Sequence, residues 1–143
     1  MKTAETFAEL SHARRLHVGA IVVKDDRIIS IGYNGMPAGW DNNCEYEVTE
    51  FQTEYGVGSK LVNTGELKTR PEVLHAETNA IAKLAKSNES GLGATMFITH
   101  APCLDCAKLI YQSGIRHVLY RDAYRDTGGV TFLEKSGITV EQV

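Results

Sequence analysis

The chain has 143 residues, of which 43% are apolar and 23% charged, with a formal net charge of −3 and a pI of about 5.9. This length predicts a single domain over residues 1–143, and the composition is typical of a soluble globular protein. The acidic balance argues against a nucleic-acid partner, because proteins that grip nucleic acid usually carry a basic face. The sequence has no apolar run of membrane-spanning length and no apolar signal-peptide core, so we expect a cytoplasmic protein without a membrane partner.

The first third of the chain predicts a helix followed by a β-hairpin. A helix is expected over residues 4–16, with Leu10 on its apolar face. Two β-branched runs, at 18–23 and 27–32, flank the polar residues 24–26. This pattern is a strong hairpin signal.

Two irregular segments follow the predicted hairpin. The stretch "YNGMPAG" at 33–39 combines Asn, Gly and Pro, which predicts a structured loop. Residues 40–73 are polar and aperiodic, and we expect a long loop that contains a short helix and covers a ligand.

After residue 74 the sequence alternates between helical periodicity and short apolar runs. The predicted elements are a helix at 75–87, a strand at 94–100, a helix at 103–113 ended by Gly114, a strand at 115–121, a helix at 128–136 and a strand at 138–143. Strands joined by crossover helices run parallel and connect right-handedly. The sequence therefore predicts an α/β domain in which a hairpin joins a mixed sheet covered by helices.

Two of the three cysteines, Cys103 and Cys106, lie in "APCLDC", where a strand ends and a helix begins. The positive end of the helix dipole favours thiolates, which both redox chemistry and metal binding require. Three interpretations are open at this point: a redox disulfide, half of a structural metal site, or part of a catalytic metal site. The redox interpretation is disfavoured by Asp105, because a nearby carboxylate opposes thiolate formation.

The preceding helix opens on "LHAETNAI", which places His75 and Glu77 two residues apart. By itself this pattern is more typical of a solvated helix start. The strand between the two helices brings both helix N-termini to one edge of the sheet, so His75, Cys103 and Cys106 can share one tetrahedral zinc ion. Three protein ligands leave the fourth position open, as in catalytic zinc sites, and Glu77 can move protons beside it.

The combined pattern H-x-E…P-C-x-x-C is the signature of zinc nucleobase deaminases. With "VGAIVVKDDRIISIGYNGMPAG", "LKTRPEVLHAETNAI" and "PCLDCAKLIYQSGIRHVLYRDAY", the chain resembles the cytidine deaminase superfamily, and within it the deoxycytidylate (dCMP) deaminases of phage and bacterial type. The resemblance implies a three-layer α/β/α fold with a five-stranded mixed sheet whose last two strands are parallel. It also implies zinc-dependent hydrolysis of dCMP to dUMP and ammonia, which supplies dUMP for thymidylate synthesis.

The resemblance further implies roles for individual residues. Zn²⁺ would be held by His75, Cys103 and Cys106, and Glu77 would carry a proton from water to the cytosine ring and the departing amine.

Substrate contacts are implied in the same way. Asn34 would contact the deoxyribose, Tyr124 the nucleotide, and Ala76 the substrate. Arg15 and Arg121 are the candidates for the 5′-phosphate, because arginine binds phosphate through paired hydrogen bonds. The alternatives are a plain turn at Asn34, ordinary partial burial of Tyr124 and solvated surface arginines.

Regulation is also implied, through activation by dCTP and inhibition by dTTP in a homohexamer, with Mg²⁺ on the effector triphosphate. The effector residues would be Gly32, Tyr33, Asn34 and Gly35, together with Lys86 late on the helix that follows His75.

Some relatives bind a second, structural zinc ion. Here Cys44 could be joined by His12 and His17, but Ala13 stands where such relatives carry a cysteine, so a free Cys44 thiol is favoured. His100, beside Ala101, is expected to line the substrate pocket.

Other functions remain open from the sequence alone. The protein could deaminate another cytosine nucleotide or nucleoside, such as dCTP or cytidine, or tRNA adenosine, and the least favoured alternative is a non-catalytic zinc-binding module. If the chain is encoded by a phage, the expected location is the cytoplasm of the host.

Overall fold

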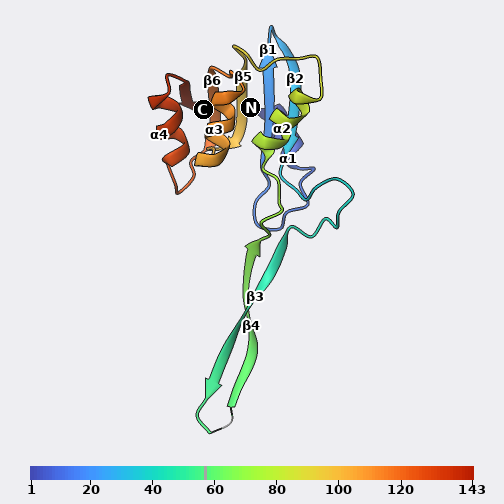
Figure 1. Ribbon diagram of the computed structural model, residues 1–143, viewed down its shortest axis with the longest axis vertical. Helices are drawn as coiled ribbons and strands as arrows, with labels where there is room; N and C mark the ends of the chain where they lie inside the picture. The colour runs from blue at the N-terminus through green and yellow to red at the C-terminus, as the bar shows by residue number, and fades with distance from the viewer. Residues whose placement is uncertain (57) are drawn as a thin grey trace.

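A computed structural model describes residues 1–56 and 58–143, and it shows a mixed β-sheet covered by helices, with a long two-stranded ribbon extending from it (Figure 1). The sheet has the strand order β2-β1-β5-β6-β7. Its strands are β1 (Gly19–Lys24), β2 (Arg27–Tyr33), β5 (Thr95–His100), β6 (His117–Asp122) and β7 (Thr139–Gln142). Strand β1 is antiparallel to β2 and β5, whereas β5, β6 and β7 are parallel. The predicted five-stranded mixed sheet with its last two strands parallel is confirmed.

In the described part of the chain four helices cover the sheet, and two glycines set the distance between helix and strand. The helices are α1 (Lys2–Ala8), α2 (Ala76–Ala85), α3 (Leu104–Gln112) and α4 (Gly128–Lys135). A Cβ atom on Gly19 would lie 2.0 Å from the carbonyl oxygen of Ala4 in α1, and one on Gly32 would lie 2.0 Å from that of Ala76 in α2. Gly19 and Gly32 lie in adjacent strands with their side-chain directions on opposite faces, since Gly32 pairs with Ala20. Helix α1 therefore lies on one face, and α2, α3 and α4 lie on the other.

The predicted hairpin between β1 and β2 is confirmed. Its turn residues Asp25 and Asp26 have φ angles of 50° and 56°, which are left-handed. Two consecutive left-handed residues define the turn whose twist matches that of the flanking strands, and Asp is among the few residues that tolerate this conformation.

The core lies between the sheet and the helices α2, α3 and α4. Apolar side chains from the central strands and these helices are fully or almost fully buried, among them Val22, Met96, Ile98, Ile110, Val118 and Leu133. The apolar periodicity after residue 74 predicted these helices and strands, and each of them is present within a few residues of its expected limits.

The helix predicted over residues 4–16 is wrong in its second half, because α1 ends at Ala8. Leu10, which was expected in the core, is 50% exposed. Beyond a turn at Ser11 the chain follows an irregular path, and its backbone N–H groups at Arg14 and Arg15 bond to the carboxylate of Glu45. These hydrogen bonds to a side chain replace those that a continued helix would have made.

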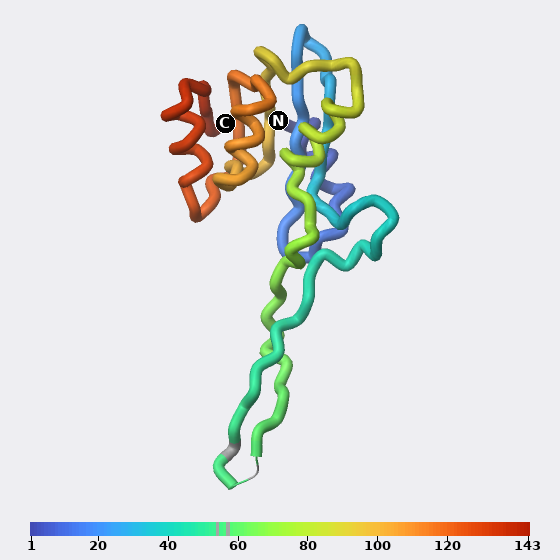
Figure 2. Tube along the Cα trace, in the orientation of Figure 1, coloured from blue at the N-terminus to red at the C-terminus, as the bar shows by residue number. Residues whose placement is uncertain are grey.

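The loop predicted over residues 40–73 is instead mostly a β-ribbon, made of β3 (Glu45–Glu54) and β4 (Gly58–Thr69). The two antiparallel strands twist around each other and project away from the sheet, as the trace in Figure 2 shows. The expected short helix is not found among the described residues of this segment.

Within the described part of the chain, no helix combines the length and apolar character needed to cross a membrane.

Candidate active site

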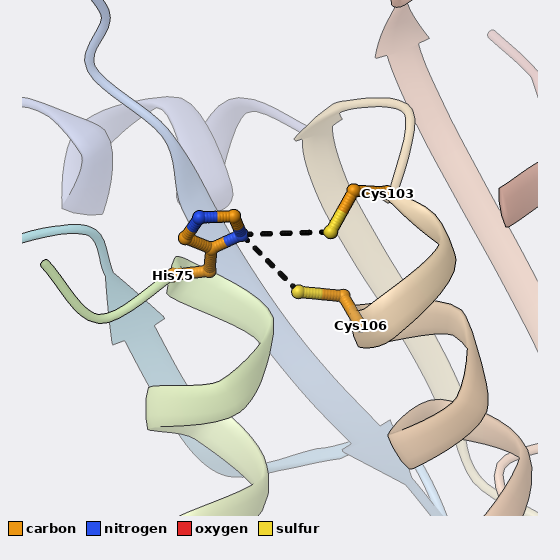
Figure 3. Close-up of side chains that lie close together, drawn as sticks. All are labelled: His75, Cys103 and Cys106. Atoms are coloured by element: carbon orange, nitrogen blue, oxygen red, sulfur yellow. Dashed lines mark hydrogen bonds between the residues drawn. The ribbon is translucent and has the colours of Figure 1, made fainter. Parts of the chain in front are cut away.

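Three side chains that can bind a metal converge where helices α2 and α3 begin. His75 immediately precedes α2, Cys103 immediately precedes α3, and Cys106 lies in the first turn of α3. The Nδ1 atom of His75 lies 3.3 Å from Sγ of Cys106 and 3.7 Å from Sγ of Cys103 (Figure 3). Among the described residues these three form the only such group of His, Cys, Asp and Glu side chains, and their ligand atoms lie within 4.8 Å of one another.

The spacing of these atoms fits a zinc ion. Zn–N bonds of about 2.0–2.1 Å and Zn–S bonds of about 2.3 Å at tetrahedral angles place N and S about 3.6 Å apart. The two distances from His75 lie on either side of that value. One imidazole and two thiolates are also ligands that Zn²⁺ prefers, and three of them leave one position open. The donor set therefore fits a catalytic zinc site.

The local charges favour a thiolate at this site. Hydrogen bonds from Cys106 and His75 lower the pKa of the Cys103 thiol to about 4. The pKa of His75 is raised, chiefly by its hydrogen bond to Cys103, and that of Cys106 is raised by its hydrogen bond to Cys103 and by burial. These neighbours favour the thiolate form of Cys103, which is the form that binds a metal ion.

A cavity of about 330 Å³ opens beside these ligands, and Glu77 lies in its wall with His75 and Cys103. The Glu77 side chain is almost completely buried, and this burial raises the pKa of its carboxyl group. The Glu77 carboxylate is therefore shielded from bulk water, yet it can contact a molecule bound in the cavity next to His75 and Cys103.

Three of the residues predicted to contact a substrate line the same cavity: Asn34, Arg15 and Tyr124. The side chain of Asn34 accepts a hydrogen bond from the N–H of Val18 and donates one to the carbonyl oxygen of Leu16, each at 2.8 Å. Asn34 thus fixes the edge of the cavity as well as lining it, while Tyr124 is 37% exposed at its mouth.

Two other predicted contact residues lie elsewhere. Ala76, the first residue of α2, is fully buried and does not line the cavity. The guanidinium of Arg121 is paired with Glu5 at 3.0 Å and with Asp122 at 2.7 Å, outside the cavity wall.

Two further residues line the cavity that were not predicted from the sequence: Glu45 and Thr69, at the end of the ribbon nearest the sheet. They face each other across β3 and β4. Glu45 and Thr69 bond to Arg15, which lies 30 or more positions away in the chain, so no local sequence pattern predicts these contacts. His100 lines the cavity as expected.

A second cavity, of about 260 Å³, lies on the "YNGMPAG" loop. Tyr33 and Gly35 line it, as does Lys83, whose ammonium group lies 5.6 Å from the centre of the Tyr33 ring. Of the other residues predicted to act on an effector, Gly32 is buried under α2 and Asn34 faces the first cavity, while Lys86 ends α2 and does not line the second cavity.

Cys44 is buried in a small apolar cluster with Ala13 and Val73, and its thiol points to the carbonyl oxygen of Asn42. Burial raises its pKa, which favours the neutral thiol. His17 bonds instead to the carbonyl oxygen of Ala13. In the part of the chain that the structure describes, these residues do not assemble a second metal site.

Comparison with known proteins identifies relatives of this fold and site. Residues 1–121 match the family described as "Cytidine and deoxycytidylate deaminase zinc-binding region". Deoxycytidylate deaminase of enterobacteria phage T4 is 35% identical over 88% of this chain and 78% of its own length, and that of Homo sapiens is 35% identical over 92% and 67%. The crystal structure of dCMP deaminase from the cyanophage S-TIM5 in complex with dCMP and dUMP is 44% identical, with a TM-score of 0.81 over 99% of this chain and 92% of that one.

Proposed function

We propose that this chain, which belongs to the cytidine and deoxycytidylate deaminase family, hydrolyses dCMP to dUMP and ammonia. One observation carries the proposal: two of the metal ligands, His75 and Cys103, line a cavity together with Glu77, and the lining of the same cavity includes Arg15 and Thr69. Its volume of about 330 Å³ suits a small ligand. The cavity thus offers groups for hydrolytic chemistry and, separately, a cation for a phosphate.

The roles within the cavity follow from the chemistry of each side chain. A zinc ion held by His75, Cys103 and Cys106 would supply a Lewis acid that makes water a better nucleophile at neutral pH. Glu77 accepts a proton from the attacking water and passes it to N3 of the cytosine ring. It then takes the proton of the new hydroxyl group on C4 and delivers it to the amine, which leaves as ammonia while the C4 carbonyl forms.

The remaining wall residues orient the nucleotide. Asn34 borders the deoxyribose and Tyr124 closes the mouth of the cavity. Arg15 binds the 5′-phosphate; Arg121 is excluded from this role because its charge is already shared with two carboxylates.

The proposal is tested by measuring ammonia release from dCMP, deoxycytidine, cytidine and dCTP at matched concentrations. We expect dCMP to be deaminated at least about a hundredfold more efficiently than deoxycytidine, because the phosphate contributes charge-assisted hydrogen bonds. Equal rates for dCMP and deoxycytidine would contradict the phosphate site. Preference for dCTP or cytidine would assign the protein to another cytosine substrate.

We also propose that the second cavity receives the effectors dCTP and dTTP, with Mg²⁺ on the triphosphate. Support comes from its lining, since Tyr33 provides an aromatic surface and Lys83 a positive charge. Lys83 takes the place that the sequence suggested for Lys86. Activity measured against dCMP with added dCTP or dTTP, in wild type and in Lys83→Gln, tests this assignment.

A homohexamer is proposed on the basis of the ribbon. A two-stranded ribbon is marginally stable alone in water, yet among the described residues β3 and β4 pack extensively only on each other. Phe51 is 75% exposed and Leu61 is 53% exposed. Residues 45–69 hold five Glu and two Lys, so they carry the whole net charge of −3 and the rest of the chain is neutral. Light scattering of the purified protein measures the subunit number directly.

We propose, finally, that residues 1–143 work as one catalytic domain in the cytoplasm, that of the host if the chain is encoded by a phage, and supply dUMP for thymidylate synthesis. The three free cysteines are consistent with a reducing compartment.

A further inference from the structure

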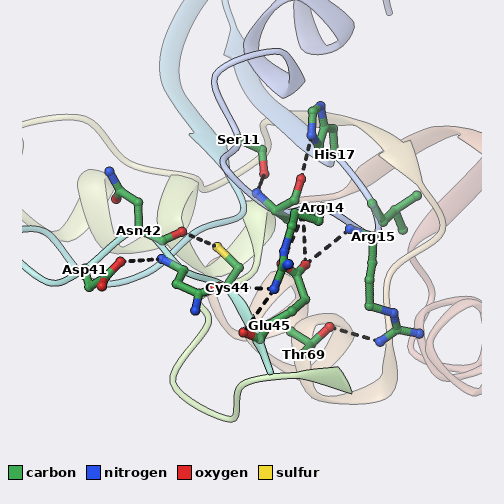
Figure 4. A network of polar contacts seen from close by, with 12 residues as sticks. Ser11, Arg14, Arg15, His17, Asp41, Asn42, Cys44, Glu45 and Thr69 are labelled. Carbon is green, nitrogen blue, oxygen red and sulfur yellow. Dashed lines mark hydrogen bonds and ion pairs between the residues drawn. The ribbon is translucent and has the colours of Figure 1, made fainter. Parts of the chain in front are cut away.

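Glu45 is a buried carboxylate at the point where the ribbon meets the cavity. Its side chain is 1% exposed, and a charge buried to this extent is strongly destabilising unless it is paired and hydrogen-bonded. The backbone N–H of Arg14 donates to both carboxylate oxygens, at 3.0 and 3.1 Å, and the N–H of Arg15 donates at 3.2 Å. The guanidinium of Arg14 completes the set at 3.5 Å (Figure 4).

These contacts hold a segment that has no regular structure of its own. Residues 12–17 join α1 to β1 outside any helix or strand. Ser11 accepts a hydrogen bond from the N–H of Ala13 at one end, Asn34 bonds the backbone of Leu16 and Val18 at the other, and Glu45 holds the middle. Glu45 thus fixes the peptide groups on both sides of Arg14, including the one that links Arg14 to Arg15.

The ribbon also holds the other end of the Arg15 side chain. Nη1 of Arg15 donates to Oγ1 of Thr69 at 3.1 Å, and Thr69 is the cross-strand neighbour of Glu45. One rung of the ribbon therefore contacts Arg15 twice, once at its backbone and once at its guanidinium. The charges of Arg14 and Glu45 cancel, which leaves the positive charge of Arg15 for a ligand in the cavity.

We propose that Glu45 is a positioning residue for the phosphate subsite, and that it acts through Arg15 to make the enzyme select a nucleoside monophosphate over a nucleoside. This inference rests on the proposed function. Glu45 does not touch the phosphate; it fixes the loop from which Arg15 extends. It should therefore govern the affinity for the phosphate and leave the chemistry beside His75 unchanged.

The test compares Glu45→Gln with wild type on two substrates, dCMP and deoxycytidine. Gln keeps the size of the side chain but replaces one acceptor oxygen with a donor that faces the donors of Arg14. We expect KM for dCMP to rise about tenfold, kcat to change less than about twofold, and deoxycytidine turnover to stay within about twofold of wild type. Glu50→Gln, an exposed carboxylate in the same strand, is the matched control and should change none of these values.

A double-mutant cycle with Arg15→Gln separates positioning from general damage. Once Arg15 is removed, Glu45→Gln should have no further effect on KM for dCMP, because both changes remove the same interaction. Equal losses on dCMP and deoxycytidine, or an additive effect in the double variant, would overturn the proposal.

The outcomes also distinguish a failure of the role proposed for Glu45 from a failure of the proposed dCMP deaminase function. Wild-type enzyme with no preference for dCMP would refute the phosphate subsite and, with it, the role of Glu45. Wild-type preference that survives in Glu45→Gln would refute only the role of Glu45. If Glu45→Gln does not fold, the same measurements on dCMP and deoxycytidine are made with Glu45→Asp. This variant keeps the charge but shortens the side chain by one methylene, which moves the carboxylate away from Arg14 and Arg15.

Discussion

Substituting Gly32 with Ala should shift helix α2 relative to the cysteines. The added Cβ would lie 2.0 Å from the carbonyl oxygen of Ala76 and 2.7 Å from the backbone nitrogen of Ala80, and both atoms belong to the helix backbone. Ordinary contact begins at 3.4 Å, so α2 must rise from the sheet by about 1.4 Å. His75 and Glu77 move with the start of this helix.

The shift of α2 should lower both the stability of the protein and its turnover of dCMP. Inserting a methyl group into a well-packed core typically costs about 1–3 kcal/mol, and here no flexible side chain can yield. We therefore expect the free energy of unfolding to fall by about 3 kcal/mol. A displacement of about 1 Å in reacting groups lowers turnover about a hundredfold, so we expect at least that loss in kcat for dCMP.

Gly35→Ala provides the control within the same motif. A Cβ on Gly35 meets nothing within 4 Å, so stability and zinc content should match wild type. Urea unfolding gives the stability of each variant, and metal analysis after dialysis gives its zinc content. Wild-type stability and full zinc content in Gly32→Ala would refute the argument that this contact sets the position of α2.

Other predictions concern the site and its surroundings. Glu77→Gln should keep one zinc per chain yet lose about 10²–10⁴ in kcat; activity within tenfold of wild type would exclude the proton-transfer role. Cys44→Ala should also keep one zinc per chain by metal analysis, and loss of metal would identify Cys44 as a ligand. Burial lowers the pKa of His100, and the positive charge of Arg121 lowers it further, whereas the negative charge of Asp122 raises it. The net effect is a lowered pKa, so folding favours the neutral form of His100. Its contribution to stability is complete above its usual pKa of 6.5 and is lost as pH falls through the lowered value. The difference in unfolding free energy between about pH 7.5 and pH 5.5 should therefore be smaller in His100→Gln, and an unchanged difference would contradict this assignment.

The parts of the fold that local sequence determines were predictable. The turn at Asp25 and Asp26 is set by neighbouring residues, and the helices after residue 74 by apolar periodicity. The metal ligands could be found because each stands at the start of a predicted helix, so chain topology alone brings them together.

The rest depends on contacts between distant residues. Residues 10–16 have a helical composition, but the backbone N–H groups of Arg14 and Arg15 bond to Glu45, which lies 31 and 30 positions away. The ribbon was missed because its strands are polar and lie in solvent, so they lack the apolar alternation that marks a strand resting on a core. The surroundings of Arg121 were not predictable either, because a sequence does not show that Glu5 and Asp122 pair with its guanidinium.

The ribbon is long, and of its described residues only the pair Glu45 and Thr69 at its near end lines the cavity. With ten residues in β3, it extends about 33 Å from the rung formed by Glu45 and Thr69. A rotation of about 5° at that rung moves the far end by about 3 Å, so a small restraint at the tip strongly limits the orientation of the root. A contact that fixes the far end of the ribbon would therefore restrict the motion of Glu45, Thr69 and Arg15 at the cavity, although the contact itself lies far from the substrate.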